Sequence, residues 1–164
     1  MKSDTQIIMD KYKDRIFAVA INICRNAADA DDIVQDTFLQ YHMSKKNFEN
    51  EEHIRNWLLR VAVNKSKNLT ASFWRRNRVS LEEYMQTLTF ESVEDENMFV
   101  QAMSLPQKYR LILHLFYFEG YSVKEIADML TLSESNVKVR LSRGRSLLKT
   151  KLTEEFEDDN ERKI

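Results

Sequence analysis

Residues 121–145 read YSVKEIADMLTLSESNVKVRLSRGR and contain two helix starts in close succession. In the first, Ser122 is followed three positions later by Glu125, which is typical of a capping box with Ser122 as the N-cap residue. Tyr121 and Ile126 stand where the hydrophobic staple that accompanies such a box is expected. A helix is therefore predicted to begin directly after Ser122.

The second start follows at Leu132 and Ser133, with Val137 completing another staple and Ser133 as the cap. Only residues 130–132 remain for a turn between the two helices. A short helix, a tight turn and a basic second helix are typical of a helix-turn-helix. Its turn often needs a positive φ at the position of Thr131, which costs a β-branched residue about 1 kcal/mol.

The second helix has an apolar side, on which Val137, Leu141 and Leu148 are predicted to point inward. The opposite side could then reach base edges in a major groove, while flanking cations contact phosphates. The reading side carries Ser135, Lys138, Val139, Ser142 and Arg143, and the flanks carry Arg140, Arg145, Lys149 and Lys151. A helical hairpin with a merely basic surface is the alternative. Gly144 interrupts this helix at a cost of about 1 kcal/mol relative to alanine.

Outward from this motif, apolar residues recur at spacings of three and four, which predicts helices. Two glycines and one proline in 164 residues argue against an all-β fold. The expected fold is all-α, with two small helical domains joined by an acidic linker and the helix-turn-helix in the C-terminal domain. The expected boundaries are 1–79 for the first domain, 80–95 for the linker, 96–153 for the second domain and 154–164 for an acidic tail.

Within the first domain, apolar stripes predict one helix over 9–23, a second from residue 30 that ends near Lys45 and Lys46, and a third from Ile54 after a polar loop at 47–53. A short helix is possible at 81–85 in the linker.

The second domain is predicted to begin with a helix at Phe99–Met103, with Pro106 in the first turn of the next helix. The run from Leu111 to Phe118 is almost wholly apolar and stops at Gly120, a residue typical of a helix C-terminus. This run is expected to be mostly buried.

Charge is sorted into blocks that the net value of −1 conceals. Every charged residue is basic in 54–79 and again in 135–152, whereas 80–98 and the tail from Glu154 are mainly acidic. Since solvated helices usually mix charges of both signs, two acid-free segments favour a polyanionic partner.

Several classes of protein are disfavoured. The single Cys24 excludes an internal disulfide, and no zinc-ligand spacing or phosphate-binding glycine loop is present, so neither metal nor cofactor is expected. His42, His53 and His114 have no partner at catalytic spacing, which argues against an enzyme. No apolar run suits a membrane span or a signal peptide, so a cytoplasmic location without membrane insertion is expected.

Three segments together resemble the extracytoplasmic-function group of bacterial sigma-70-type RNA polymerase sigma factors. Residues 29–38, DADDIVQDTF, resemble the core-binding part of region two, and residues 56–64, NWLLRVAVN, running on to Arg75 and Arg76, resemble its promoter-melting part. Residues 105–148 resemble region four, which reads the minus-thirty-five element. The resemblance implies a factor that binds core polymerase, recognises promoters and melts DNA to start transcription.

By position, the resemblance implies site residues and partners. Asp32, Gln35 and Asp36 would meet the clamp helices of the polymerase β′ subunit, and the C-terminal domain would meet the β flap. Phe48 and Asn64 would hold a flipped minus-ten base, while Lys67, Arg75 and Arg76 would hold DNA backbone. For Phe48, a loop aromatic that fills the helix junction is an equal alternative, and Trp57 is better explained by core packing. An anti-sigma factor is a further implied partner.

Two rival interpretations come from other classes of protein. A two-domain helix-turn-helix regulator that is not associated with polymerase would explain residues 121–145 but not the acid-free helix in the first domain. A helical module that binds only protein partners would have no use for a basic reading side.

Overall fold

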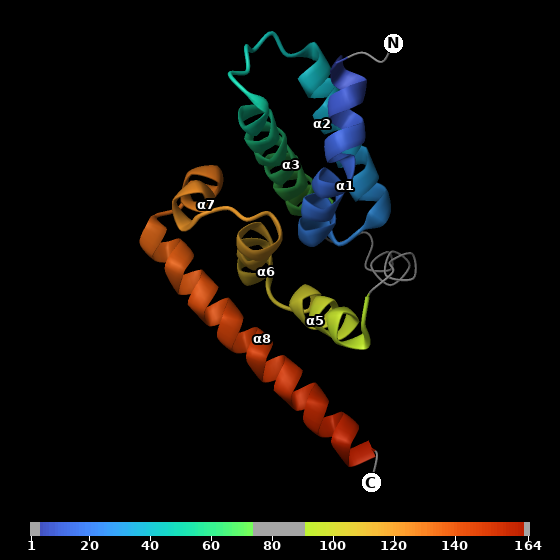
Figure 1. Cartoon of the computed structure of the whole chain (residues 1–164), viewed down its shortest axis with the longest axis vertical. Coiled ribbons are helices and arrows are strands. Elements are labelled where there is room, and N and C mark those ends of the chain that lie inside the picture. Colours follow the sequence, from blue (N-terminus) through green and yellow to red (C-terminus); the bar gives the residue numbers. More distant parts are fainter. Residues whose placement is uncertain (1–3, 74–90, 163–164) are drawn as a thin grey trace. The chain divides into compact units, whose positions relative to one another are not determined.

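The chain forms two compact helical units, Met1–Leu88 and Thr89–Ile164, in a computed structural model that describes residues 4–73 and 91–162. Within these ranges there are helices and turns but no strand, which confirms the predicted all-α class (Figure 1). Each unit has its own buried apolar core.

The N-terminal unit consists of three helices that pack against one another: α1 (Asp4–Cys24), α2 (Ala27–Met43) and α3 (Glu51–Phe73) (Figure 1). Its most deeply buried side chains include Ile16, Val19, Leu58, Leu59 and Val63, of which Leu59 and Val63 were not among the apolar positions predicted to point inward. Burying such side chains contributes roughly 1.5–3 kcal/mol each, which holds the three helices as one body.

Local signals set the boundaries of α2 and α3. Asn26 caps α2 by accepting the Asp29 N–H at 3.0 Å, and Arg25 before it has a positive φ of 55°. Helix α2 ends at Met43, slightly before the predicted Lys45 and Lys46. Helix α3 begins at Glu51, inside the predicted loop 47–53, because Asn50 Oδ1 accepts the His53 N–H at 2.8 Å and so acts as an N-cap that the apolar pattern did not reveal.

The C-terminal unit consists of α5 (Val93–Met103), α6 (Gln107–Leu113), a π-helical turn (His114–Phe118), α7 (Val123–Leu130) and α8 (Glu134–Arg162) (Figure 1). Ser92 caps α5 by accepting the Asp95 N–H at 3.1 Å, so the last residues of the predicted linker 80–95 are helical. The possible helix at 81–85 lies outside the described residues. Residues 154–162 of the predicted tail continue α8.

The apolar run 111–118 is mostly buried, as predicted, but its last two residues are exposed. Leu111, Ile112, Leu113 and Leu115 are buried, whereas Tyr117 is 54% and Phe118 is 72% exposed. The cause is the π turn, in which the Glu119 N–H bonds to the His114 carbonyl at 3.1 Å. A π turn holds more residues than an α turn and so rotates the following side chains away from the core.

A buried arginine links α5 to α6. The Arg110 guanidinium donates to the carbonyl oxygens of Leu105 at 2.9 Å and of Met103 at 3.4 Å. These carbonyls lie at and beyond the end of α5, where helix geometry leaves acceptors without an intrahelical partner. Arg110 therefore fixes the α5–α6 connection.

Candidate functional site

The helix-turn-helix is formed as the capping signals predict. Ser122 Oγ accepts the Glu125 N–H at 3.1 Å, and the Ser122 N–H donates to Glu125 Oε1 at 3.1 Å, which completes the capping box of α7. At the start of α8, Ser133 Oγ accepts the Asn136 N–H at 3.1 Å. Both helix starts are thus held by hydrogen bonds between neighbouring residues.

The turn between α7 and α8 is left-handed at Thr131, with φ 57° and ψ 48°. The Leu132 N–H closes the turn by donating to the Ala127 carbonyl at 2.9 Å, and the Ala127 side chain is buried. The positive φ expected at this position is confirmed.

The exposed side of α8 carries the predicted reading residues. Val137 and Leu141 are buried and Leu148 is half-buried, which places the inward stripe as predicted. The exposed residues on the other side are Ser135, Lys138, Val139, Ser142 and Arg143. Because successive residues turn by about 100°, Ser135, Val139 and Ser142 form the centre of this side, and Lys138 and Arg143 lie on opposite flanks of it.

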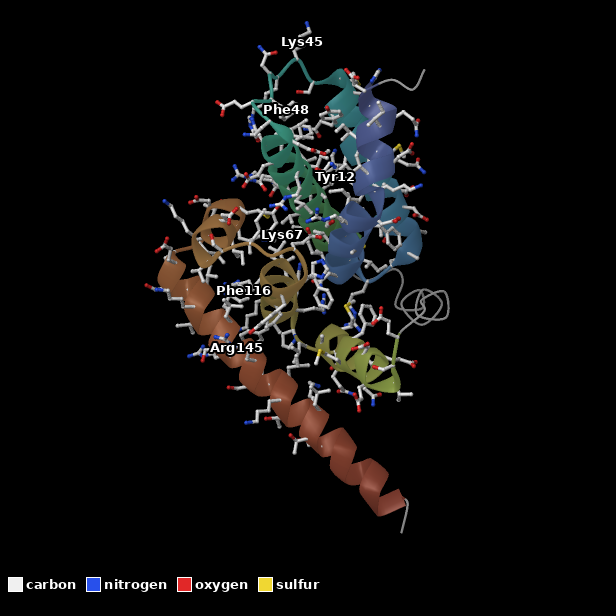
Figure 2. All side chains as sticks on the ribbon, in the orientation of Figure 1. Tyr12, Lys45, Phe48, Lys67, Phe116 and Arg145 are labelled. Atoms are coloured by element: carbon white, nitrogen blue, oxygen red, sulfur yellow. The ribbon has the colours of Figure 1, made fainter. Side chains whose placement is uncertain are left out.

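Arg140 differs from these residues. It is half-buried, and its Nε donates to Asn136 Oδ1 on the same helix at 2.9 Å. Arg145 is exposed and donates to the Tyr117 hydroxyl at 3.1 Å, which ties α8 to the π turn (Figure 2). Both arginines are therefore partly engaged within the unit, whereas Lys138 and Arg143 project from it.

Gly144 has a packing role that its helix propensity did not indicate. A Cβ atom at this position would lie 3.3 Å from Cγ and Cδ1 of Leu113 and 3.3 Å from Cβ of Tyr109. Helix α8 therefore approaches α6 closely at Gly144. The absence of a side chain fixes how α8 lies on the core of the unit and hence which side faces outward.

A second exposed surface runs along α2. Asp32, Gln35 and Asp36 are exposed, while Ile33, Val34, Thr37 and Phe38 on the other side are buried. At helical spacing the same surface continues to Leu39 and Met43, which are 56% and 71% exposed. We call this surface, Asp32, Gln35, Asp36, Leu39 and Met43, the α2 face; its apolar end was not predicted.

A third surface lies on α3. Arg60, Asn64 and Lys67 are exposed and follow one another at spacings of four and three, so they share one side of the helix. Figure 2 labels Lys67 on α3. We call them the α3 face. Beyond Glu52, the charged residues of α3 are Arg55, Arg60, Lys65 and Lys67, so the helix is basic along most of its length. Arg60 is an addition to the predicted residues, and Arg75 and Arg76 lie outside the described residues.

Phe48 lies in the loop before α3 within a cluster of rings (Figure 2). Its ring centroid is 5.5 Å from that of Tyr41, 5.6 Å from that of Trp57 and 5.2 Å from that of His53. All four rings are half-buried, so the cluster is open to solvent on part of its surface. Trp57 thus packs against the rings of Tyr41 and Phe48, and Phe48 contacts rings of both α2 and α3. Asn64 lies two turns beyond Trp57, about 10 Å along the helix axis.

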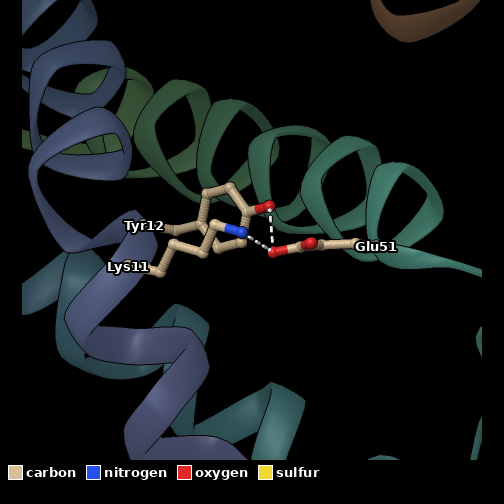
Figure 3. A network of polar contacts seen from close by, with 3 residues as sticks. All are labelled: Lys11, Tyr12 and Glu51. Atoms are coloured by element: carbon tan, nitrogen blue, oxygen red, sulfur yellow. Dashed lines mark hydrogen bonds and ion pairs between the residues drawn. The ribbon is translucent and has the colours of Figure 1, made fainter.

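The first turn of α3 is attached to α1 by a polar network (Figure 3). Lys11 Nζ forms an ion pair with Glu51 Oε1, and the Tyr12 hydroxyl donates to the same oxygen at 3.0 Å. The Lys11 hydrogen bond, followed by that of Tyr12, lowers the pKa of Glu51, and the hydrogen bond to Glu51 raises the pKa of Lys11. Glu51 is in the first turn, where a carboxylate also suits the helix dipole.

Two classes of site are absent from the described parts of the chain. No group of three or more histidine, cysteine or acidic side chains there could hold a metal ion. None of the helices in residues 4–73 and 91–162 is both long and apolar enough to cross a membrane.

Comparisons with known families match both units. Residues 8–79 match the family model described as Sigma-70 region 2, and residues 102–148 match Sigma-70, region 4. The chain is 34% identical over 128 residues to the RNA polymerase sigma factor SigZ of Bacillus subtilis, covering 73% of this chain and 70% of that protein. It is 28% identical over 166 residues to the ECF RNA polymerase sigma factor SigW of Bacillus subtilis, covering 88% and 87%.

Solved structures share the fold. The sigma factor RpoE of Bartonella quintana, crystallised with the anti-sigma factor NepR, has a TM-score of 0.69 at 18% identity and covers 90% of this chain and 93% of its own. CnrH, in complex with the cytosolic domain of CnrY, has a TM-score of 0.65 at 24% identity and covers 91% and 87%.

Proposed function

Because the chain belongs to the extracytoplasmic-function group of sigma-70-type RNA polymerase sigma factors, we propose that it binds core RNA polymerase and directs it to promoters, which it recognises and melts. The observation that carries this function is the match of region 2 and region 4, in that order, to two separately folded units. A helix-turn-helix regulator that is not associated with polymerase would have no counterpart of region 2, so the comparisons do not support that alternative.

The test of the whole assignment is reconstitution. The purified chain should co-elute with core polymerase, and the resulting holoenzyme should start transcripts at specific sites on genomic DNA of its own source. A chain that binds DNA without binding core polymerase would contradict the assignment.

The α2 face is the proposed contact with the β′ clamp helices. Its polar residues Asp32, Gln35 and Asp36 are exposed and do not contribute to the core, so a partner can reach them without unfolding the unit. The triple alanine variant should bind core polymerase more weakly, while its stability changes by less than about 0.5 kcal/mol for each surface substitution. Unchanged core binding in this variant would exclude the face.

The α3 face and the ring cluster are the proposed contact with the minus-ten element. An unstacked base can be held by an aromatic ring and read by an amide, roles proposed for Phe48 and Asn64, while Lys67 contacts phosphate. Arg75 and Arg76 are proposed to contact the backbone as well. The packing of Phe48 against three rings also fits the purely structural alternative, so the test must separate stability from DNA binding.

Alanine at Phe48 or Asn64 should weaken binding of the holoenzyme to single-stranded minus-ten DNA, since one stacked base contributes roughly 1–3 kcal/mol. Core binding should be retained. If Phe48→Ala weakens core binding by the same factor as DNA binding and also lowers the melting temperature, Phe48 is a structural residue only.

The exposed side of α8 is the proposed minus-thirty-five reader, with Ser135, Lys138, Val139, Ser142 and Arg143 toward base edges. Arg140 is proposed as a contact whose orientation its bond to Asn136 sets. Loss of a base contact costs about 1–3 kcal/mol and relaxes discrimination at one position, whereas loss of a phosphate contact weakens all sequences alike.

A salt series separates the two kinds of contact on α8. Arg143→Ala should lose discrimination at one base pair, and Lys149→Ala should reduce the salt slope by about one unit. If Arg143→Ala weakens binding to every duplex by one common factor, the reading side is rotated from the one proposed.

Further partners and the location of action complete the proposal. The C-terminal unit is proposed to contact the β flap, and an anti-sigma factor is proposed to restrain the chain, as the complex of the Bartonella quintana relative illustrates. We propose that the chain acts in the cytoplasm, where its polymerase is, as a regulator without catalysis of its own.

A further inference from the structure

The loop between α2 and α3, residues 44–50, is joined to the first turn of α3 by two hydrogen bonds that meet at His53. The Glu49 N–H donates to His53 Nδ1 at 3.2 Å, and the His53 N–H donates to Asn50 Oδ1 at 2.8 Å. A backbone N–H can only donate, so Nδ1 is the acceptor in the first of these hydrogen bonds. The backbone next to Phe48 is therefore attached to one side chain of α3.

The same imidazole contacts the ring of Phe48. The two rings meet edge to face at 5.2 Å and 67°, and Trp57, one turn further along α3, makes a similar contact at 5.6 Å and 75°. The ring of Tyr41, on α2, is a third neighbour of the Phe48 ring, with 5.5 Å between the two ring centroids. Edge-to-face pairs of this kind favour one relative orientation of the rings. His53 thus restrains both the Phe48 ring and the peptide group that follows it.

The helix turn that carries His53 is itself anchored. Glu51, two residues earlier, is held by Lys11 and Tyr12 of α1 (Figure 3). The start of α3 is therefore linked to α1, and the loop is attached to this first turn of α3. A loop held in its binding conformation before the ligand arrives avoids the ordering cost that a loose loop would have on binding.

We infer that His53 is a positioning residue for minus-ten recognition: it acts through Phe48 and the Glu49 peptide, presetting the loop for single-stranded DNA. This inference rests on the proposed contact of Phe48 with the minus-ten strand. It predicts that the acceptor at the Nδ1 position, rather than the bulk or charge of the histidine, determines DNA affinity.

The test compares three replacements of His53 in the full chain. His53→Asn places an amide oxygen near the position of Nδ1 and can still accept from Glu49. His53→Gln places its amide near the position of Nε2, and His53→Leu fills the volume with no acceptor. His42→Leu is the matched control, because His42 is in the same unit and its Nδ1 is paired with Thr5 Oγ1 rather than with the Glu49 peptide.

The first readout is the loop itself. Exchange of the Glu49 amide, followed by NMR in the free protein, should accelerate at least about threefold in His53→Gln and His53→Leu, and should stay near the wild-type rate in His53→Asn and His42→Leu. The circular dichroism spectrum of each variant verifies that the helices are retained, and a second acceptor-free variant is available if one of them does not fold.

The second readout is DNA affinity of the reconstituted holoenzyme. The probe is the single-stranded DNA sequence that the wild-type holoenzyme enriches from a random pool, with oligothymidine of equal length as its reference. The two acceptor-free variants should bind this probe about fivefold to tenfold more weakly, as expected for one lost hydrogen bond and its ring contact. His53→Asn should recover most of this loss.

A Phe48→Ala holoenzyme distinguishes the possible failures. If Phe48→Ala weakens probe binding but the acceptor-free His53 variants do not, the positioning inference is overturned and the proposed role of Phe48 stands. If Phe48→Ala has no effect on probe binding, or the wild type enriches no sequence, the minus-ten assignment itself is wrong and the inference falls with it. Equal loss in His53→Asn and His53→Leu would also overturn the inference, because the acceptor would then be irrelevant.

Discussion

Acidification should destabilise the C-terminal unit through His114, because the Nε2 atom of this residue is buried and has no hydrogen-bond partner among the described residues. Burial lowers the pKa of His114 to about 4 from its ordinary value of 6.5, and the nearby Glu119 carboxylate opposes this shift only in part. The unfolded chain recovers the ordinary pKa. Between pH 6.5 and about pH 4 the unfolded state therefore binds more protons than the folded state, and stability falls as the pH falls.

The size of the effect follows from the two pKa values of His114. One pKa unit corresponds to about 1.4 kcal/mol, so the loss below the folded pKa reaches roughly 3 kcal/mol, of which about 2 kcal/mol is already lost at about pH 5. For a unit of fewer than about 100 residues, each kcal/mol shifts the melting temperature by about 4–8 °C. The C-terminal unit should therefore melt roughly 8–16 °C lower at about pH 5 than at neutral pH.

The assay is native-state hydrogen exchange of the buried Ile112 and Leu115 amides in the full chain, which reports the opening free energy of this unit alone. His114→Leu removes the titrating group and the unpartnered nitrogen, although it also loses the ring stacking on Phe118 at 5.3 Å. The opening free energy should fall by about 2 kcal/mol more in wild type than in His114→Leu between about pH 7.5 and about pH 5. Identical falls in the two proteins would refute the reasoning, because other groups would then carry the pH dependence.

Other predictions concern packing, capping and the polymerase contact. Gly144→Ala should stabilise the C-terminal unit by clearly less than the roughly 1 kcal/mol that this change brings in an open helix, since the added Cβ meets α6 at 3.3 Å, and a full gain of about 1 kcal/mol in thermal melting would contradict this close approach. Ser122→Ala should cost about 1 kcal/mol by removing the cap of α7, and Glu125→Gln, which can still complete a capping box, should cost much less in the same denaturation series. Leu39→Ser should leave stability within about 0.5 kcal/mol but weaken holoenzyme assembly about fivefold, and unchanged assembly would remove Leu39 from the α2 face.

Signals confined to a few neighbouring residues predicted the structure well. The capping box of Ser122 and Glu125, the cap at Ser133 and the positive φ at Thr131 all depend on bonds within one turn, so they can be inferred from spacing alone. The three-and-four periodicity likewise separated buried from exposed positions on α2 and α8, because a helix fixes the direction of each side chain.

Features that depend on distant contacts could not be predicted in this way. Gly144 looked like a simple cost in helix propensity, because its neighbours Tyr109 and Leu113 belong to another helix. Apolar character alone did not indicate that Phe118 is exposed, since the hydrogen-bond register that turns it outward is not encoded in hydrophobicity.

The candidate surfaces also divide into features that local spacing predicts and features that depend on contacts between distant residues. The exposed polar residues of α2 followed from periodicity and from the family resemblance. The proposed role of His53 rests on contacts of its ring with both the Glu49 peptide and the Phe48 ring, which are brought together only when the loop is folded.

At the π turn His114–Phe118, the chain can lose one residue without losing the helix. Such a turn holds about one residue more than an α turn over a similar rise, so deletion of one residue here can be absorbed by closing the turn into ordinary α-helix. A deletion in the turn at Thr131 cannot be absorbed in this way. It would rotate α8 about its own axis and present different side chains to DNA. We expect single-residue deletions among descendants of this gene to be tolerated at 114–118 and eliminated around Thr131.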